Sequence, residues 1–342
     1  MNKALKKIFL AAGYATNRSF VPPESLSLLL TFRCNLRCRT CSIWQQENSD
    51  ELTVADWLKI VKDLAATLPP RTFVELNGGE PLTRPELALA LIKELKKHFF
   101  LVTLNSNGLL LGAELVKELE DAGLDAIKIS FYSLEQEAHN FLRGTGTSYE
   151  AARRAIGLLE KSRIKLEVGI LIAKQNIDGL PELIEHLNSL TNTAVILQPL
   201  DESVESLAAK DRKHIFLLND LWPSAAEVKK FFSWLYAHRP KIKNSPANIK
   251  AIENYYLNPP SVLAFRCFAG QRSVVVYPAG AVALCFKGAT IGNLKNNSLK
   301  NILNSHPAKA ERKQIVSCRK YCRIIGCNFS RGIREVVKNR LV

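Results

Sequence analysis

The cysteines are the residues of this chain whose type and spacing could do chemistry, because all eight fall into two groups. Three lie close together at Cys34, Cys38 and Cys41, and the other five lie much later, at Cys267, Cys285, Cys318, Cys322 and Cys327. Cysteines that serve as small core residues would be scattered along the chain. A secreted disulfide scaffold would be shorter and denser in cysteine. Two groups with close internal spacing therefore predict metal ligands.

The first group has a spacing that suits an iron–sulfur site. Three thiolates within eight residues can hold three corners of a 4Fe–4S cube, and the fourth iron then lacks a protein ligand. A small molecule can bind the metal directly at such an open position, as it does in catalytic sites. Zinc would usually take a fourth ligand, and no nearby histidine offers one. A zinc knuckle or three unrelated cysteines are the alternative interpretation.

This triad resembles the signature of the radical S-adenosylmethionine (SAM) superfamily. That signature is Cys, three residues, Cys, two residues, Cys after the first strand of a partial barrel, and here Cys34-Asn-Leu-Arg-Cys38-Arg-Thr-Cys41 follows the apolar run 26–33. The resemblance covers residues 25–200. It implies that SAM binds the open iron, that its reductive cleavage yields a 5′-deoxyadenosyl radical, and that this radical abstracts hydrogen from a C–H bond. The residue before the third cysteine departs from the family, which commonly has an aromatic residue where this chain has Thr40.

The resemblance also implies SAM contacts at the ends of the second and third strands. Gly78, Gly79 and Glu80 match the family motif that binds the SAM amino group, and glycines let the backbone approach a ligand closely. Asn107 ends the third strand, where related enzymes place a polar group on the ligand. Without the cysteine triad, this motif would be only a Gly-Gly turn.

Two further contacts are implied around the fourth strand. Ser130 ends that strand, where related enzymes contact the carboxylate and the ribose, although the usual aspartate two residues later is Tyr132 here. Arg143 matches an arginine that can grip the SAM carboxylate bidentately. A surface arginine at a helix end is the alternative. No catalytic residue is assigned beyond the cluster ligands.

The second cysteine group resembles the SPASM or twitch extension, which holds auxiliary iron–sulfur clusters in many radical SAM enzymes. Cys267, Gly280 and Cys285 have the matching spacing. A full SPASM extension has seven cysteines, whereas this chain has five. The resemblance therefore implies one auxiliary 4Fe–4S cluster, held by Cys267 and Cys285 together with two of Cys318, Cys322 and Cys327. A structural zinc site is the alternative.

The segments around these motifs predict an α/β fold. Six β-rich apolar runs alternate with helical patterns, at residues 26–33, 72–76, 99–104, 126–132, 165–172 and 193–200. Such strands predict a parallel sheet buried on both faces, with ligands at the carboxyl ends of the strands. Six units rather than eight predict a partial (β/α)6 TIM-type barrel, and an open doubly wound sheet is the alternative. A hairpin around Ala279-Gly280 predicts that the cysteine-rich extension is a small α+β unit.

These patterns divide the 342 residues into four parts. We expect a basic amphipathic leader at 1–24, a radical SAM core at 25–200, a helical linker at 201–262, and an auxiliary cluster domain with a basic tail at 263–342. A hydrophobic content of 47% suits a large core. No apolar run is long enough to predict a transmembrane segment, and we expect a cytoplasmic protein.

The net charge of +15 is concentrated near the C-terminus. Residues 25–200 carry 19 Lys/Arg against 22 Asp/Glu, whereas residues 287–342 carry 13 against 2. A basic surface of this kind predicts an anionic partner. A solvated face that aids solubility explains the charge equally well.

Together these features predict a radical SAM oxidoreductase or transferase-type enzyme that acts on a small-molecule or carbohydrate substrate, with reduced flavodoxin or ferredoxin as its electron donor. Peptide maturation of the SPASM type is the alternative. We expect no peptide-docking domain in the roughly 25 residues before the barrel, which weakens this alternative without removing it, because docking domains can be separate chains. An iron–sulfur nucleic-acid-binding or regulatory protein is the alternative from another class. It predicts salt-sensitive nucleic-acid binding without SAM cleavage.

Overall fold

A computed structural model describes residues 3–46, 49–201 and 220–324 of the chain. Six strands form the first part of the fold: β1 Ser25–Leu29, β2 Phe73–Asn77, β3 Leu101–Ser106, β4 Ala126–Ser130, β5 Lys165–Leu171 and β6 Thr193–Gln198. The helices between them are α2 Val54–Thr67, α3 Pro85–Lys97, α4 Ala113–Asp121, α5 Gln136–Arg143, α6 Ser148–Glu160 and α7 Leu180–Ser189. The predicted alternation of strands and helices is confirmed.

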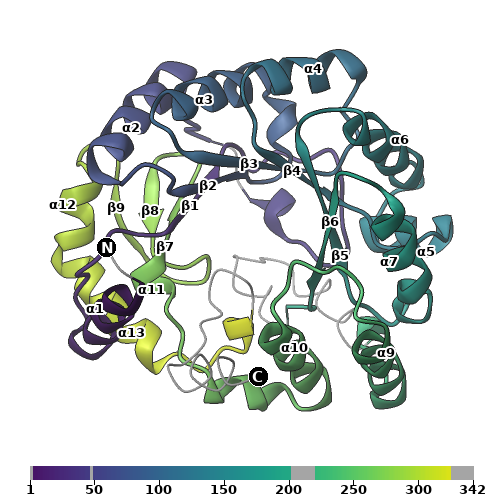
Figure 1. Ribbon diagram of the computed structural model, residues 1–342. Helices are drawn as coiled ribbons and strands as arrows, with labels where there is room; N and C mark the ends of the chain where they lie inside the picture. The colour runs from purple at the N-terminus through teal and green to yellow at the C-terminus, as the bar shows by residue number, and fades with distance from the viewer. Residues whose placement is uncertain (1–2, 47–48, 202–219, 325–342) are drawn as a thin grey trace.

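All neighbouring pairs from β1 to β6 are parallel and follow chain order. A doubly wound sheet would instead reverse its strand order partway. In Figure 1 the strands curve around a central space, with α2, α3, α4, α6 and α7 outside them. The predicted partial TIM-type barrel is therefore confirmed, and the doubly wound alternative is wrong.

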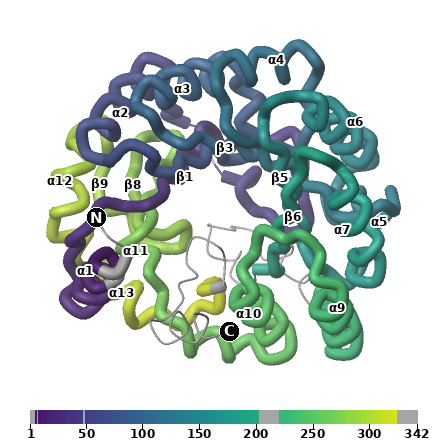
Figure 2. Tube along the Cα trace, viewed as in Figure 1, coloured from purple at the N-terminus to yellow at the C-terminus, as the bar shows by residue number. Residues whose placement is uncertain are grey.

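The cysteine-rich extension continues the same sheet. Its strands are β7 Ser273–Val276, β8 Ala281–Ala283 and β9 Thr290–Asn293, and β7 pairs with β1 in parallel while β8 and β9 are antiparallel. The predicted hairpin is β7–β8. Between β6 and this extension lie α9 Ala225–His238 and α10 Pro246–Leu257, and the helices of the extension are α11 Ala269–Arg272, α12 Leu299–Asn304 and α13 His306–Ser317. The N-terminal helix α1, Lys3–Thr16, lies beside α11 and α13 (Figure 2).

The two faces of the sheet differ in chemistry. Apolar side chains such as Leu28 and Leu76 are fully buried against the outer helices. On the inner face, Ser27, Glu75 and Asn77 are polar and only partly buried. The expectation of a sheet buried on both faces is therefore wrong for the inner face of β1 and β2, because this face lines the site described below. None of the helices in the described ranges is long and apolar enough to cross a bilayer.

Candidate active site

The first cysteine group lies in the loop that follows β1, at the carboxyl edge of the sheet. The Cys41 N–H donates to the Cys38 carbonyl (3.2 Å), and the Leu36 N–H donates to Cys34 Sγ (3.4 Å). Burial raises the pKa of Cys34, and it raises the pKa of Cys41 to about 11. The charge of neighbouring cysteines raises the pKa of Cys34 and of Cys41 further, so the three thiols lie close enough to interact electrostatically. Metal binding would hold them as thiolates.

The first cysteine group has to be compared with what each kind of metal site requires. Zinc would draw its sulfur ligands to about 2.3 Å from one centre and would usually take a fourth ligand. A 4Fe–4S cube spreads its cysteines over separate iron atoms. Three cysteines on one short loop supply one ligand each to three of those irons.

The loop after β2 packs directly on the residues that lead into Cys34. The Gly79 N–H donates to the Thr31 carbonyl (2.8 Å). A Cβ on Gly79 would lie 2.2 Å from the Arg33 carbonyl oxygen, and a Cβ on Gly78 (φ 134°) would lie 2.3 Å from that of Thr31. Only glycine fits at both positions. The predicted first strand, 26–33, ends at Leu29, because the carbonyls of Thr31 and Arg33 accept from Gly79 and Glu80 in this loop instead of continuing the ladder.

The Glu80 carboxylate is 1% exposed and joins the ends of β2 and β3. One oxygen accepts from the Leu82 N–H (3.1 Å) and the Ser106 hydroxyl (3.0 Å), and the other accepts from the Asn107 N–H (2.7 Å). Burial raises the pKa of Glu80. Asn107 in turn donates its side-chain amide to Asn35 Oδ1 (2.7 Å), inside the cysteine loop. Two of the predicted contacts thus lie together beside the first cysteine group.

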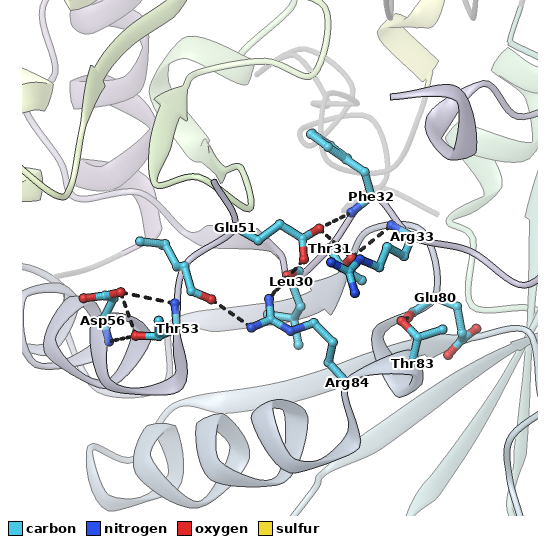
Figure 3. Close-up of polar contacts among 11 residues, drawn as sticks. Leu30, Thr31, Phe32, Arg33, Glu51, Thr53, Asp56, Glu80, Thr83 and Arg84 are labelled. Atoms are coloured by element: carbon cyan, nitrogen blue, oxygen red, sulfur yellow. Dashed lines mark hydrogen bonds and ion pairs between the residues drawn. The ribbon is translucent and has the colours of Figure 1, made fainter. Parts of the chain in front are cut away.

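A second carboxylate, Glu51, holds the entry to the cysteine loop (Figure 3). Its Oε1 accepts from the Thr31 hydroxyl (2.6 Å) and the Phe32 N–H (3.1 Å), and its Oε2 lies 3.4 Å from an Arg84 nitrogen. Arg84 also donates to the Leu30 carbonyl (3.0 Å). Sequence reasoning missed Glu51, whose one signal is its place just before the start of α2.

The C-terminal turn of α5 packs against the middle of the cysteine loop. The Arg39 N–H donates to the Leu142 carbonyl (3.2 Å), and Arg39 Nε donates to the Phe141 carbonyl (3.0 Å). A Cβ on Gly144 (φ 68°) would lie 2.1 Å from the Arg37 carbonyl oxygen. Gly144 was also missed, although a glycine just past a helix end is a recognisable signal for a left-handed cap.

Arg143 is buried, with 7% exposure, and its charge acts on all three cysteines of the first group. Its Nη1 donates to the Tyr132 hydroxyl (3.1 Å). Its Nε is buried and has no hydrogen-bond partner in the described part of the chain. The alternative of a surface arginine is therefore wrong. Ser130 ends β4, opposite Gly169 of β5.

Four cysteines of the second group lie together. Cys267 precedes α11, Cys285 follows β8, and Cys318 and Cys322 follow α13. Burial raises the pKa of Cys267, Cys285 and Cys322, and the charge of other cysteines in the group raises each further. The structure thus places Cys318 and Cys322 with the predicted pair. Cys327 lies outside the described residues.

An apolar wall connects the two cysteine groups. Its buried members are Leu29, Val275 and Ala283, which lie on β1, β7 and β8. The partly exposed side chains packed on them flank the cysteines of both groups: Phe32, Ile43, Tyr277 and Phe286. The inner face of β2–β4 is instead polar, with an ion pair between Glu75 and Lys128 (2.8 Å). The sheet therefore carries an apolar patch at β1, β7 and β8 and a polar one at β2–β4.

Comparisons with known proteins agree with this arrangement. The family model of the radical SAM superfamily matches residues 28–187, and that of SPASM, an iron-sulfur cluster-binding domain, matches residues 267–328. The PqqA peptide cyclase of Granulibacter bethesdensis is 24% identical over 283 residues, which are 82% of this chain and 72% of that protein. The AdoMet-dependent heme synthase of Methanosarcina barkeri is 24% identical over 288 residues, 82% of each chain.

Among solved structures, Streptococcus suis SuiB bound to its precursor peptide SuiA has a similar fold. Its TM-score is 0.65 at 15% identity, covering 90% of this chain and 70% of that chain. At this identity the likeness concerns the fold alone.

Proposed function

Because this chain belongs to the radical SAM superfamily and carries a C-terminal SPASM domain, we propose that it is an enzyme that modifies a peptide. A radical SAM enzyme works with a 4Fe–4S cluster and SAM, and the SPASM domain adds auxiliary iron–sulfur binding. When bound, the reduced cluster supplies the electron that cleaves the sulfonium C–S bond of SAM. The protein's own residues bind, orient and shield the reactants.

Cys34, Cys38 and Cys41 are the proposed ligands of the cluster that binds SAM. The grouping of their thiols and their spacing within one loop support this assignment. The Nε–H of Arg143, which has no partner in the described part of the chain, would donate to the SAM carboxylate. Asn107 and Ser130, at the neighbouring strand ends, would contact the carboxylate and the ribose hydroxyls.

The SAM amino group is assigned to the backbone of Gly78 and Gly79. Both glycines lie against the entry to the cysteine loop, where any larger residue would collide. The oxygens of Glu80 already accept three hydrogen bonds inside the protein. We therefore assign Glu80 to holding the strand ends and not to direct contact with SAM.

Cys267, Cys285, Cys318 and Cys322 are the proposed ligands of one auxiliary cluster. Four thiolates supply one ligand for each iron of a 4Fe–4S cube. A closed site of this kind would move electrons or support structure, since it leaves no iron open for substrate.

The proposal of a peptide substrate rests on the similarity to a peptide cyclase. The match to the PqqA peptide cyclase spans 82% of this chain, and the sequence alone had favoured a small molecule or a carbohydrate. The apolar wall between the two cysteine groups suits a target side chain held between the clusters. The heme synthase, which matches over the same share of the chain, makes a non-peptide substrate such as a tetrapyrrole the second candidate.

The first test concerns the chemistry. Anaerobically reconstituted protein, reduced with dithionite and given SAM, should release 5′-deoxyadenosine, as measured by mass spectrometry. Cys34→Ala should abolish this release and leave the barrel folded, as judged by circular dichroism. Cleavage that persists in this variant would refute the ligand assignment.

The second test concerns the substrate. The enzyme is co-expressed with each short open reading frame that neighbours its gene, and the peptides are compared by mass spectrometry with those made beside Cys34→Ala. A mass change that needs Cys34 supports a peptide substrate. Unchanged peptides, together with turnover of a tetrapyrrole by the same preparation, would favour the second candidate.

A further inference from the structure

Glu75, on the inner face of β2, accepts hydrogen bonds from side chains on β1, on β4 and on its own strand. Its carboxylate accepts from the Ser27 hydroxyl on β1 (3.3 Å), from Asn77 Nδ2 on β2 (3.2 Å) and from Lys128 Nζ on β4 (2.8 Å). The side chain of Asn105 on β3 lies close enough to lower the pKa of Glu75 as well. One carboxylate therefore links the strands that lead into the proposed SAM site.

This arrangement satisfies Glu75 but leaves other polar groups unsatisfied. Asn77 turns its amide nitrogen to Glu75, and the side chain of Asn105 lies close to the same carboxylate. Their Oδ1 atoms are buried and have no partner within the described ranges. A buried acceptor without a donor is destabilising. The Glu75–Lys128 ion pair is partly exposed (side chains 20% and 19% exposed), and such a pair seldom stabilises a fold more than apolar residues of the same size. Stability alone therefore does not explain why these polar side chains gather around Glu75.

The location of these polar side chains suggests a reason for their presence. Two or three residues beyond these side chains, the same strands end in the parts of the proposed site: β1 leads to the cysteine loop, β2 to Gly78 and Gly79, β3 to Asn107 and β4 to Ser130. A small shift of one strand end against the others would misplace the groups that must contact SAM together. Misplacement by about 1 Å is enough to cost as much as a hundredfold in activity.

We infer that Glu75 is a positioning residue for SAM, which fixes the ends of β1–β4 relative to one another without touching the ligand. The inference rests on the proposed SAM site and adds a residue that no family motif marks. It predicts different effects on binding and on stability, since removing the polar side chains around Glu75 should weaken SAM binding without unfolding the protein.

The test uses the double variant E75M/K128M, which removes both charges and keeps similar side-chain volumes. Two quantities are measured: the midpoint of thermal unfolding of the protein without clusters, and the SAM dissociation constant of the anaerobically reconstituted protein, from the change in its cluster EPR signal. The control is Lys96→Met. Lys96 pairs with Asp125 (2.6 Å), whose carboxylate also accepts from the Val102 N–H (2.7 Å), so this pair holds β3 and β4 at their opposite ends.

E75M/K128M should weaken SAM binding about tenfold, while its unfolding midpoint stays the same or rises. Lys96→Met should lower the midpoint and keep the SAM dissociation constant within about twofold. Normal SAM binding by E75M/K128M would overturn the inference, and so would an equal loss of binding in Lys96→Met. If the double variant does not fold, the single variant Glu75→Gln is tested instead. It should bind SAM about fivefold more weakly, and unchanged binding would contradict the inference. Wild-type protein that holds its cluster yet binds no SAM would overturn the proposed function as well.

Discussion

The Glu51 carboxylate accepts a 2.6 Å hydrogen bond from the Thr31 hydroxyl, so a residue beyond the cysteine loop holds the backbone that enters it. The Thr31 hydroxyl also accepts from the Arg33 N–H (3.0 Å), one residue before Cys34. The side chain of Glu51 is only 8% exposed, and Arg84 balances its charge. The entry to the first cysteine group is therefore fixed by side chains and not by the sheet.

Glu51→Ala should destabilise the protein by about 2–3 kcal/mol, because the Phe32 N–H and the Thr31 hydroxyl lose a charged acceptor. Chemical denaturation of the protein without clusters measures this effect. Iron retained after anaerobic reconstitution should also fall. The control is Glu118→Ala on the exposed side of α4, which should change stability by less than about 0.5 kcal/mol. Equal stability of the two variants would contradict the role of Glu51.

Gly144→Ala should be strongly destabilising, because a Cβ would lie 2.1 Å from the Arg37 carbonyl oxygen and the residue has φ 68°. We expect a loss above about 2 kcal/mol in thermal unfolding. Gly157→Ala is the matched control, since Gly157 lies in α6 with nothing near its missing Cβ. That variant should gain roughly 0.5–1 kcal/mol from better helix propensity. A Gly144→Ala protein as stable as wild type would show that the cysteine loop can move away from α5.

Cys322→Ala should lose the auxiliary cluster and keep the SAM cluster, so bound iron should fall by about half. Cys327→Ala should retain all its iron, because Cys267, Cys285, Cys318 and Cys322 lie together and supply one ligand for each iron of a 4Fe–4S cube. Iron and sulfide analysis of both variants gives the answer. A loss of iron in Cys327→Ala with none in Cys322→Ala would reverse the assignment.

His139 predicts how stability depends on pH. It is fully buried, and its Nδ1 accepts from the Tyr132 N–H (3.2 Å). Burial and, next, the charge of Arg143 lower the pKa of His139 from 6.5 to about 3. At pH values between about 3 and 6.5 the unfolded chain binds a proton that the folded chain does not. The contribution of His139 to folding stability is therefore fully present above about pH 6.5 and is lost as the pH falls.

The slope from this one group approaches 1.4 kcal/mol per pH unit below about pH 6. His139→Gln should therefore flatten the stability profile between pH 7 and pH 5, in cluster-free protein where acid-labile iron does not interfere. The control is His186→Gln, because His186 is exposed on α7. Parallel profiles for wild type and His139→Gln would show that this histidine does not titrate as described.

The sequence predicted the barrel because alternating strand and helix patterns are local, and each of the six strands lies within a few residues of its expected place. It was less reliable at strand ends, as the run 26–33 shows. Leu30, Thr31 and Phe32 are residue types that suit a strand, but from Thr31 onward the loop after β2 and Glu51 take over the hydrogen bonds of the backbone. Those partners come from distant segments that no local pattern can indicate.

By itself the sequence determined the chemistry proposed for the first cysteine group, because its three cysteines lie within one loop and their spacing alone sets how they could bind iron. Only the tertiary structure brought four cysteines of the second group together, since Cys267 lies before β7, Cys285 lies between β8 and β9, and Cys318 and Cys322 follow α13. The same is true of Glu75, Glu51 and Gly144. Each acts through contacts between strands, helices and loops that only folding brings together.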